Sequence, residues 1–167
     1  MAAVDENLQS ITKDEIRKLA NVRRGYTYFK NGDVLFAKIT PCMENGKIFI
    51  ARNLKNGIGF GSTEFHVLRV REKVLPKWLF YFLWNPEFRK EAENNMTGTA
   101  GQQRVPVDFL KNSKIPLPSV AEQKKIIAYL DSLSQKFRQL QNLQSQTISN
   151  FSDLRQSILS QAFNPVS

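Results

Sequence analysis

The C-terminal part of the chain carries apolar residues at the spacing of a long helix that pairs with another helix. Steps of alternately four and three residues from Ile126 give one continuous stripe, which consists of Ile126, Leu130, Leu133, Phe137, Leu140, Gln144, Thr147, Phe151, Leu154 and Ile158. This series fills the a and d positions of a heptad repeat. The predicted helix covers 119–163, or about 68 Å at about 1.5 Å per residue. A small domain cannot cover a stripe of that length, so the pattern predicts a partner helix of similar length.

Both ends of this helix have sequence signals. Ser119 is suited to the N-cap, and Glu122 three residues later completes a capping box. Asn164-Pro165 ends the pattern because proline cannot continue a helix, which leaves 164–167 as a tail.

Two members of the stripe are polar. Packing alone explains the apolar members of the stripe, but it does not explain why polar residues occupy two of its positions. These are Gln144 and Thr147, which lie together near the middle of the helix. Buried polar residues in coiled coils fix register and orientation. Their central position favours an antiparallel pair in which the two polar centres meet, and packing without such a role stays open as the alternative.

Residues 1–118 have the composition of a globular domain. Nearly all glycines and prolines lie before residue 119. Three apolar runs, 34–39, 47–51 and 65–70, are rich in β-branched and aromatic residues and predict strands. The loop 40–46 between the first two contains Pro41 and Asn45-Gly46, which favour a turn.

Glycine and proline also divide the rest of this domain. The glycine-rich segment 57–61 is interpreted as a turn between strands. A helix is predicted after Pro76, with a buried stripe that consists of Trp78, Leu79, Phe82 and Leu83. Pro86 starts a second helix, capped by Asn85. The predicted fold class is therefore α+β: a mixed domain with a small sheet, followed by one long helix that forms a coiled coil.

Charge points to a polyanionic partner. The chain has 24 Lys and Arg against 15 Asp and Glu, a net charge of +9, and a pI near 9.8. Residues 1–120 hold 19 basic and 12 acidic side chains, whereas 121–167 hold five and three. The surplus therefore belongs mainly to the globular domain, as expected of a nucleic-acid-binding surface.

The sequence contains few residues suited to catalysis or metal binding. Cys42 and His66 are the single residues of their types, so neither an internal disulfide nor a Cys/His zinc cluster is expected. His66 lies on a predicted strand, where a half-buried structural role is the simpler explanation. No phosphate-binding loop, signal segment or membrane span is apparent. We expect a cytoplasmic protein with no catalytic residues, no metal and no cofactor of its own.

Two groups of polar residues are candidates for DNA contact. The first surrounds the predicted hairpin and consists of Lys38, Lys47, Arg52 and Lys55, with Thr40 and Asn45 in the loop. The second lies in the loop 97–104 and consists of Gln102, Gln103 and Arg104. Lysine and arginine bind phosphates, while glutamine and arginine can address the edges of adenine and guanine. Each residue alone is equally well explained as a solvated surface group or a loop-stabilising amide, but the set favours DNA binding.

Four blocks of the chain together resemble a known family. They are Gly32–Lys47 (GDVLFAKITPCMENGK), Gly61–Arg69 (GSTEFHVLR), Gly101–Arg104 (GQQR) and Ile115–Gln123 (IPLPSVAEQ). In this order they closely resemble the specificity subunit of type I restriction-modification enzymes, and the resemblance spans almost the whole chain.

The resemblance implies a target recognition domain over 1–118 and a spacer helix over 119–163. In that family two such domains each read half of a bipartite double-stranded DNA site, and two antiparallel helices set the gap. The subunit is not catalytic: it holds modification subunits, which bind S-adenosylmethionine and methylate adenine, and in the complete enzyme ATP-driven restriction subunits.

The chain has one domain and one helix, so the resemblance implies half a specificity subunit. Its first residues look like a point already inside a recognition domain. We expect two identical chains to form a homodimer by pairing their helices antiparallel.

One alternative is a decoy that pairs with specificity or modification subunits through its helix without reading DNA. A basic-zipper transcription factor fits less well, because no basic helix leads into the heptads.

Overall fold

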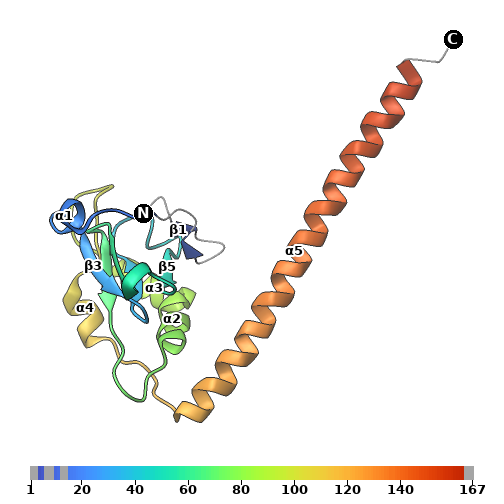
Figure 1. Ribbon diagram of the computed structural model, residues 1–167. Helices are drawn as coiled ribbons and strands as arrows, with labels where there is room; N and C mark the ends of the chain where they lie inside the picture. The colour runs from blue at the N-terminus through green and yellow to red at the C-terminus, as the bar shows by residue number, and fades with distance from the viewer. Residues whose placement is uncertain (1–3, 6–9, 12–14, 164–167) are drawn as a thin grey trace. The chain divides into compact units, whose positions relative to one another are not determined.

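The computed structural model describes residues 4–5, 10–11 and 15–163, so the predicted tail 164–167 lies outside the described residues. The chain is mixed α+β with small antiparallel sheets and one long C-terminal helix, which confirms the predicted fold class (Figure 1). It divides into a globular unit that ends at Gln123 and a helical unit that begins at Lys124. The elements are β1 (Val4–Asp5), β2 (Ser10–Ile11), α1 (Leu19–Val22), β3 (Thr27–Lys30), β4 (Val34–Ala37), β5 (Ile48–Ile50), the 3-10 turn η1 (Lys55–Gly57), β6 (Ile58–Gly61), β7 (Phe65–Leu68), α2 (Pro76–Trp84), α3 (Pro86–Asn94), α4 (Val107–Asn112) and α5 (Val120–Phe163).

A three-stranded antiparallel sheet in the order β5-β4-β7 forms the centre of the globular unit. All four residues of β4 are buried. Because side chains alternate between the faces of a strand, Val34 and Phe36 pack with α2 and α3, whereas Leu35 and Ala37 pack with Phe29 on the other face. The three predicted strands therefore exist, and the first two form the predicted hairpin.

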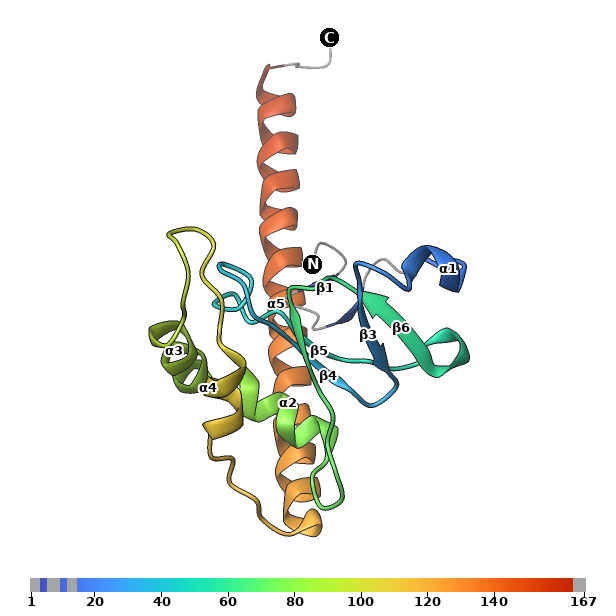
Figure 2. The same cartoon turned by 90° about the vertical axis from the view of Figure 1, so that its left-hand side faces the viewer.

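A separate two-stranded ribbon, β3 with β6, corrects one prediction. The glycine-rich segment 57–61 is largely strand β6 rather than a turn, and Gly59 and Gly61 lie opposite Phe29 and Thr27. A Cβ atom on Gly59 would lie 2.4 Å from the Phe29 ring. The glycines thus make room for Phe29, which is buried against the sheet. In Figure 2 the ribbon lies on one side of the three-stranded sheet and helices α2–α4 on the other.

The buried stripe of α2 differs from the predicted one. Leu79, Phe80 and Leu83 are buried, whereas Trp78 and Phe82 are only partly covered. Trp78 is half-buried, and its indole Nε1 donates to the carbonyl oxygen of Pro116 at 2.9 Å. A tryptophan with a polar partner at the core boundary does not need full burial.

Both predicted helix caps are present. The Asn85 side chain accepts from the amide of Glu87 at 2.8 Å at the start of α3. At the start of α5, the Glu122 carboxylate accepts from the amide of Ser119 at 2.9 Å, and the Ser119 hydroxyl accepts from the amide of Glu122 at 3.3 Å. These reciprocal bonds confirm the capping box.

Candidate nucleic-acid interface

The two polar loops predicted from the sequence meet at one edge of the globular unit. The amide of Val105 donates to the carbonyl oxygen of Lys38 at 2.8 Å, and the amide of Thr40 donates to that of Gln103 at 3.0 Å. Segments 38–40 and 103–105 therefore run as a short antiparallel pair, with Ile39 opposite Arg104. We call this pair together with the loops 40–46 and 97–104 the loop edge, which can be followed in Figure 2.

The loop 40–46 is fixed from beneath. Met43 is fully buried, and its amide donates to the carbonyl oxygen of Ile39 at 3.1 Å. Gly46 has a φ of +73°, and a Cβ atom there would lie 3.1 Å from Nη1 of Arg89, so this position favours glycine. The same Nη1 donates to the carbonyl oxygen of Glu44. This support leaves Asn45 exposed at the loop surface.

The loop 97–104 is closed at its base. Thr97 and Arg104 exchange backbone hydrogen bonds of 3.0 and 2.8 Å. Gly98 has a φ of +123°, and a Cβ atom there would lie 2.9 Å from the carbonyl oxygen of Gln102. Gln102 and Gln103 are exposed at the end of this closed loop. Their side-chain amides are therefore presented on a backbone that is already ordered.

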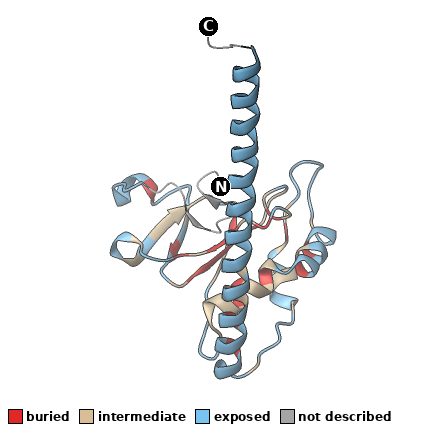
Figure 3. Ribbon diagram, turned by 90° about the vertical axis from the view of Figure 1, so that its right-hand side faces the viewer, coloured by how far each residue is buried: buried red, intermediate tan, exposed pale blue. Residues whose placement is uncertain are grey.

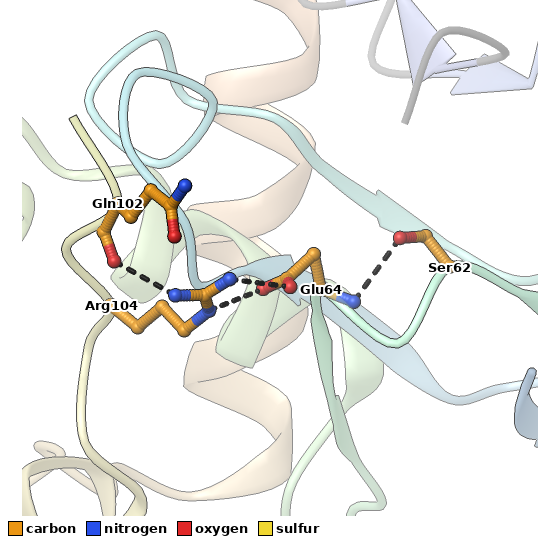
Figure 4. Close-up of polar contacts among 4 residues, drawn as sticks. All are labelled: Ser62, Glu64, Gln102 and Arg104. Atoms are coloured by element: carbon orange, nitrogen blue, oxygen red, sulfur yellow. Dashed lines mark hydrogen bonds and ion pairs between the residues drawn. The ribbon is translucent and has the colours of Figure 1, made fainter. Parts of the chain in front are cut away.

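Arg104 is held by the globular unit itself. Its Nε and Nη2 each donate to one oxygen of the Glu64 carboxylate at 2.9 Å, and its Nη1 donates to the carbonyl oxygen of Gln102 at 2.8 Å (Figure 4). Ser62 in turn accepts from the amide of Glu64 at 3.1 Å. The hydrogen bond from Arg104 lowers the pKa of Glu64, so the carboxylate is charged at neutral pH. This bidentate pair fixes the plane of the guanidinium.

His66 connects the sheet to the same edge. Its Nε2 lies 2.8 Å from the carbonyl oxygen of Val105, the distance of a hydrogen bond in which the imidazole donates. Burial lowers the pKa of His66, and Lys38 acts in the same direction. His66 is therefore a neutral structural residue that anchors the segment after the loop 97–104, as its place on a strand had indicated.

The predicted DNA-binding residues are not all brought together. Lys38 and Thr40 are half-buried within the paired segments, and Lys47 is half-buried at the end of the 40–46 loop, where its amide donates to the carbonyl oxygen of Cys42 at 3.0 Å. Arg52 follows β5 and lies at the opposite end of the β4–β5 hairpin. It is exposed but does not belong to the loop edge.

Sequence reasoning missed one residue that positions the candidate site and one that supports the fold. Glu64 pairs with Arg104 across 40 positions, and no local pattern reveals such a contact. Gln123 is completely buried: its side chain accepts from the amide of Leu75 at 3.0 Å and donates to the carbonyl oxygens of Lys73 and Pro118 at 2.7 and 3.0 Å. One more backward step of three residues from Ile126 along the heptad stripe reaches Gln123, and this signal could have found it.

Helix α5 from Lys124 onward leaves the predicted stripe largely uncovered. Every side chain in 135–163 is exposed, which Figure 3 shows as pale blue along the helix. Phe137 is 67% exposed and Phe151 68%. The apolar surface is also wider than the predicted stripe; the further exposed members are Leu143, Ile148 and Leu159. Thr147 donates its hydroxyl to the carbonyl oxygen of Leu143 at 2.9 Å, so this polar residue is satisfied within one helix.

Other site types find no support in the described part of the chain. Among residues 4–5, 10–11 and 15–163, no group of three His, Cys, Asp or Glu side chains could hold a metal ion. The helices of the same residues include none that is long and apolar enough to cross a membrane.

Comparison with known proteins decides the family. A family model described as the type I restriction modification DNA specificity domain matches residues 6–150. The chain belongs to this family. The specificity subunit of the type I restriction enzyme EcoAI from Escherichia coli is 47% identical over 128 residues, which are 76% of this chain and 22% of that protein. That of EcoEI, also from Escherichia coli, is 38% identical over 134 residues, which are 80% of this chain and 23% of that protein.

The fold agrees with this assignment. The crystal structure of the HsdS subunit from Thermoanaerobacter tengcongensis superposes with a TM-score of 0.74 at 24% sequence identity, covering 99% of this chain and 43% of that one. The chain spans less than a quarter of the length of the EcoAI and EcoEI specificity subunits.

Proposed function

We propose that the globular unit is a target recognition domain that reads double-stranded DNA through the loop edge. The observation that carries this proposal is the backbone pairing of 38–40 with 103–105, which joins two polar loops that are far apart in the sequence. Exposed amides on an ordered backbone are suited to hydrogen-bond the edges of bases. In the terms of the family, residues 1–118 form this domain.

The residues of the loop edge have different roles in this proposal. Gln102, Gln103 and Asn45 are exposed and address bases, with Thr40 beside them. Lys38 and Lys47 contact phosphates, and Arg52 does so outside the loop edge. Arg104 is held by Glu64, so we assign it the role of a positioning residue that orders the loop carrying the two glutamines.

We further propose that residues 119–163 form a spacer and dimerisation helix that pairs antiparallel with α5 of a second copy. The exposed apolar residues of α5 support this, because a stripe of that size is otherwise left in water. The polar positions Gln144 and Thr147 then lie near the dimer axis. The two domains of such a homodimer face two inverted copies of one half-site.

The chemistry belongs to partner subunits in this proposal. The chain docks modification subunits, which bind S-adenosylmethionine and methylate adenine, and in the complete enzyme restriction subunits that use ATP. The chain itself then selects the site and catalyses nothing.

Methylation mapping tests the whole scheme. The chain is co-expressed with a modification subunit, and methylated adenines are located across the host DNA. We expect methylation at a bipartite palindrome, with two inverted half-sites separated by a fixed gap. Methylation without a common sequence, or at an asymmetric site, would contradict reading by a symmetric pair of domains.

A second candidate function is favoured by the exposed stripe of α5 alone. In this alternative the chain pairs through its helix with specificity or modification subunits as a decoy and does not read DNA. A gel shift with random duplex DNA, with and without modification subunit, separates the two. The reading function requires a DNA complex that contains the chain, whereas the decoy gives only protein–protein complexes.

A further inference from the structure

The β3–β6 ribbon has an outer face opposite the buried Phe29. Tyr28 lies directly across from Phe60, and Lys30 across from Ile58. Because side chains alternate along a strand, these four residues share the face that Phe29 does not occupy. The Tyr28 and Phe60 rings meet edge to face with centroids 5.6 Å apart, and Tyr28 is 47% exposed. We call these four residues the outer ribbon face.

The two segments that build the outer ribbon face and its flanks are rich in basic residues and contain no acidic ones. Residues 16–32 and 45–63 contain no Asp or Glu. They contribute seven exposed cations, which are Arg17, Lys18, Arg23, Arg24, Lys30, Arg52 and Lys55. Of these, Arg17 is paired with Glu15, which lies just outside the first segment.

Lys30 and Lys55 lie at the same end of the ribbon. The amide of Asn31 donates to the carbonyl oxygen of Gly57 at 3.0 Å, which joins the end of β3 to η1. Close to this end, Asp33 holds Arg69: its carboxylate accepts from Nε and Nη2 of Arg69, each at 2.7 Å. Asp33 is buried and its charge is paired with Arg69, and the same carboxylate also attracts Lys30.

We propose that the outer ribbon face is a second contact surface for double-stranded DNA, with Lys30 and Lys55 binding phosphates. This inference rests on the proposed DNA-reading function and extends it to a region on the other side of the sheet from helices α2–α4 (Figure 2). Exposed cations on acid-free segments suit a uniformly negative partner such as a duplex backbone. Tyr28, which lies two residues before Lys30 on the same face, adds an exposed side chain whose hydroxyl can donate to phosphate oxygen.

Salt-dependent binding to duplex DNA tests this proposal. The full chain, its Lys30→Ala/Lys55→Ala variant and a control Lys111→Ala/Lys114→Ala variant are titrated with a random-sequence duplex at several salt concentrations. The control removes the same charge from exposed positions at the end of α4 and just after it. Loss of two phosphate contacts reduces the slope of log affinity against log salt by about 1.8. We expect this reduction in the ribbon variant and a much smaller one in the control.

Equal slopes for the two variants would overturn the ribbon contact, since only long-range charge would then be acting. Thermal unfolding of both variants confirms that each is folded. Titrations with individual duplexes test the reading function separately. If the chain prefers some duplexes but the ribbon variant keeps the salt slope of the unmodified chain, only the ribbon contact is overturned. If the ribbon variant has the reduced slope but the chain shows no preference between duplexes, the reading function is overturned and the phosphate contact remains. A chain that binds no duplex overturns both.

Discussion

In the globular unit both faces of the central sheet are covered by the chain itself, whereas along α5 the apolar residues beyond Leu130 stay exposed. Val34 and Phe36 are completely buried among helices, and Leu35 is buried on the opposite face. Phe137 and Phe151, residues of the same chemistry, keep about two thirds of their surface in water. The difference shows that apolar side chains build a core only where the topology returns other segments to them.

A single α-helix has no neighbour to provide this cover. Its backbone hydrogen bonds are satisfied internally, but its stripe needs another helix. The globular unit is therefore expected to depend on contacts within the chain, and α5 on contacts with a partner. Predictions that act on one region and spare the other test this division.

The largest expected effect is on the proposed pairing of α5. Phe137→Glu/Phe151→Glu places charges within the stripe, and an uncompensated buried charge weakens association by at least about 100-fold. Analytical ultracentrifugation should show the variant as a monomer at concentrations where the unmodified chain is a dimer. Gln135→Glu/Ser149→Glu is the matched control, because it adds the same charge on the side of the helix away from the stripe. Equal assembly of both variants would rule out the proposed register.

The next effect lies at the boundary between the two units. Gln123→Ala removes three hydrogen bonds from a completely buried side chain and leaves the Leu75 amide and two carbonyl groups without this partner. We expect the free energy of unfolding of the globular unit to fall by about 2 kcal/mol. Urea unfolding followed by tryptophan fluorescence measures it, since Trp78 and Trp84 lie in α2.

Gln135→Ala, on an exposed glutamine of α5, is the control for that experiment and should change little. Dimerisation of Gln123→Ala should be unaffected, because Gln123 is buried within the globular unit and precedes Ile126, the first residue of the proposed stripe. A loss of pairing without a loss of stability would reverse the assignment of Gln123 to the globular unit.

Local patterns predicted much of this fold, and the reasons differ by element. The α5 stripe and the Ser119 capping box depend on residues three and four positions apart, so a sequence shows them directly. Strands β4, β5 and β7 are apolar because both faces of their sheet are buried. By contrast, the glycines of β6 predict a turn from the sequence. Their real cause is the Phe29 ring across the ribbon, which local sequence does not show.

The candidate site shows the same limit. Its two loops could be identified by their polar residues, but their meeting depends on the pairing of Lys38 with Val105, which no local pattern encodes. For the same reason, the partner of Arg104 could not be anticipated. An arginine in a polar loop suggests a base contact until Glu64 is placed beside it.

Glu64 provides a smaller effect, confined to the globular unit. Glu64→Gln keeps the size of the side chain but replaces the ion pair with Arg104 by a weaker neutral hydrogen bond. The loop that carries Gln102 and Gln103 therefore becomes less ordered. We expect preference between duplex sequences to fall about fivefold, within the range of one base contact, while salt dependence changes little. Competition binding with matched duplexes measures the preference. Glu87→Gln, an exposed carboxylate in α3, is the control. An equal loss of affinity on all sequences would show that the pair only maintains the fold.

The smallest effect is a pH dependence that α5 should not share. Burial lowers the pKa of His66 below its ordinary value, so the unfolded chain takes up a proton at a higher pH than the folded chain does. The contribution of neutral His66 to the free energy of unfolding is therefore fully present above about pH 6.5, the pKa of an unfolded histidine. It is lost as the pH decreases through the folded pKa. The pKa values of Asp33 and Glu64 are also lowered, but from carboxyl values that lie well below this range.

Thermal unfolding at pH 7.5 and pH 5.5, followed by near-ultraviolet circular dichroism, tests this dependence. The unmodified chain should lose stability at the lower pH, and His66→Gln, which keeps a donor for Val105 but cannot titrate, should lose less. The dimer affinity of α5 should be the same at both values, because the single histidine of the chain lies in β7. An identical loss in His66→Gln would assign the dependence to other groups, and a change in dimer affinity would show that the two regions do not respond independently.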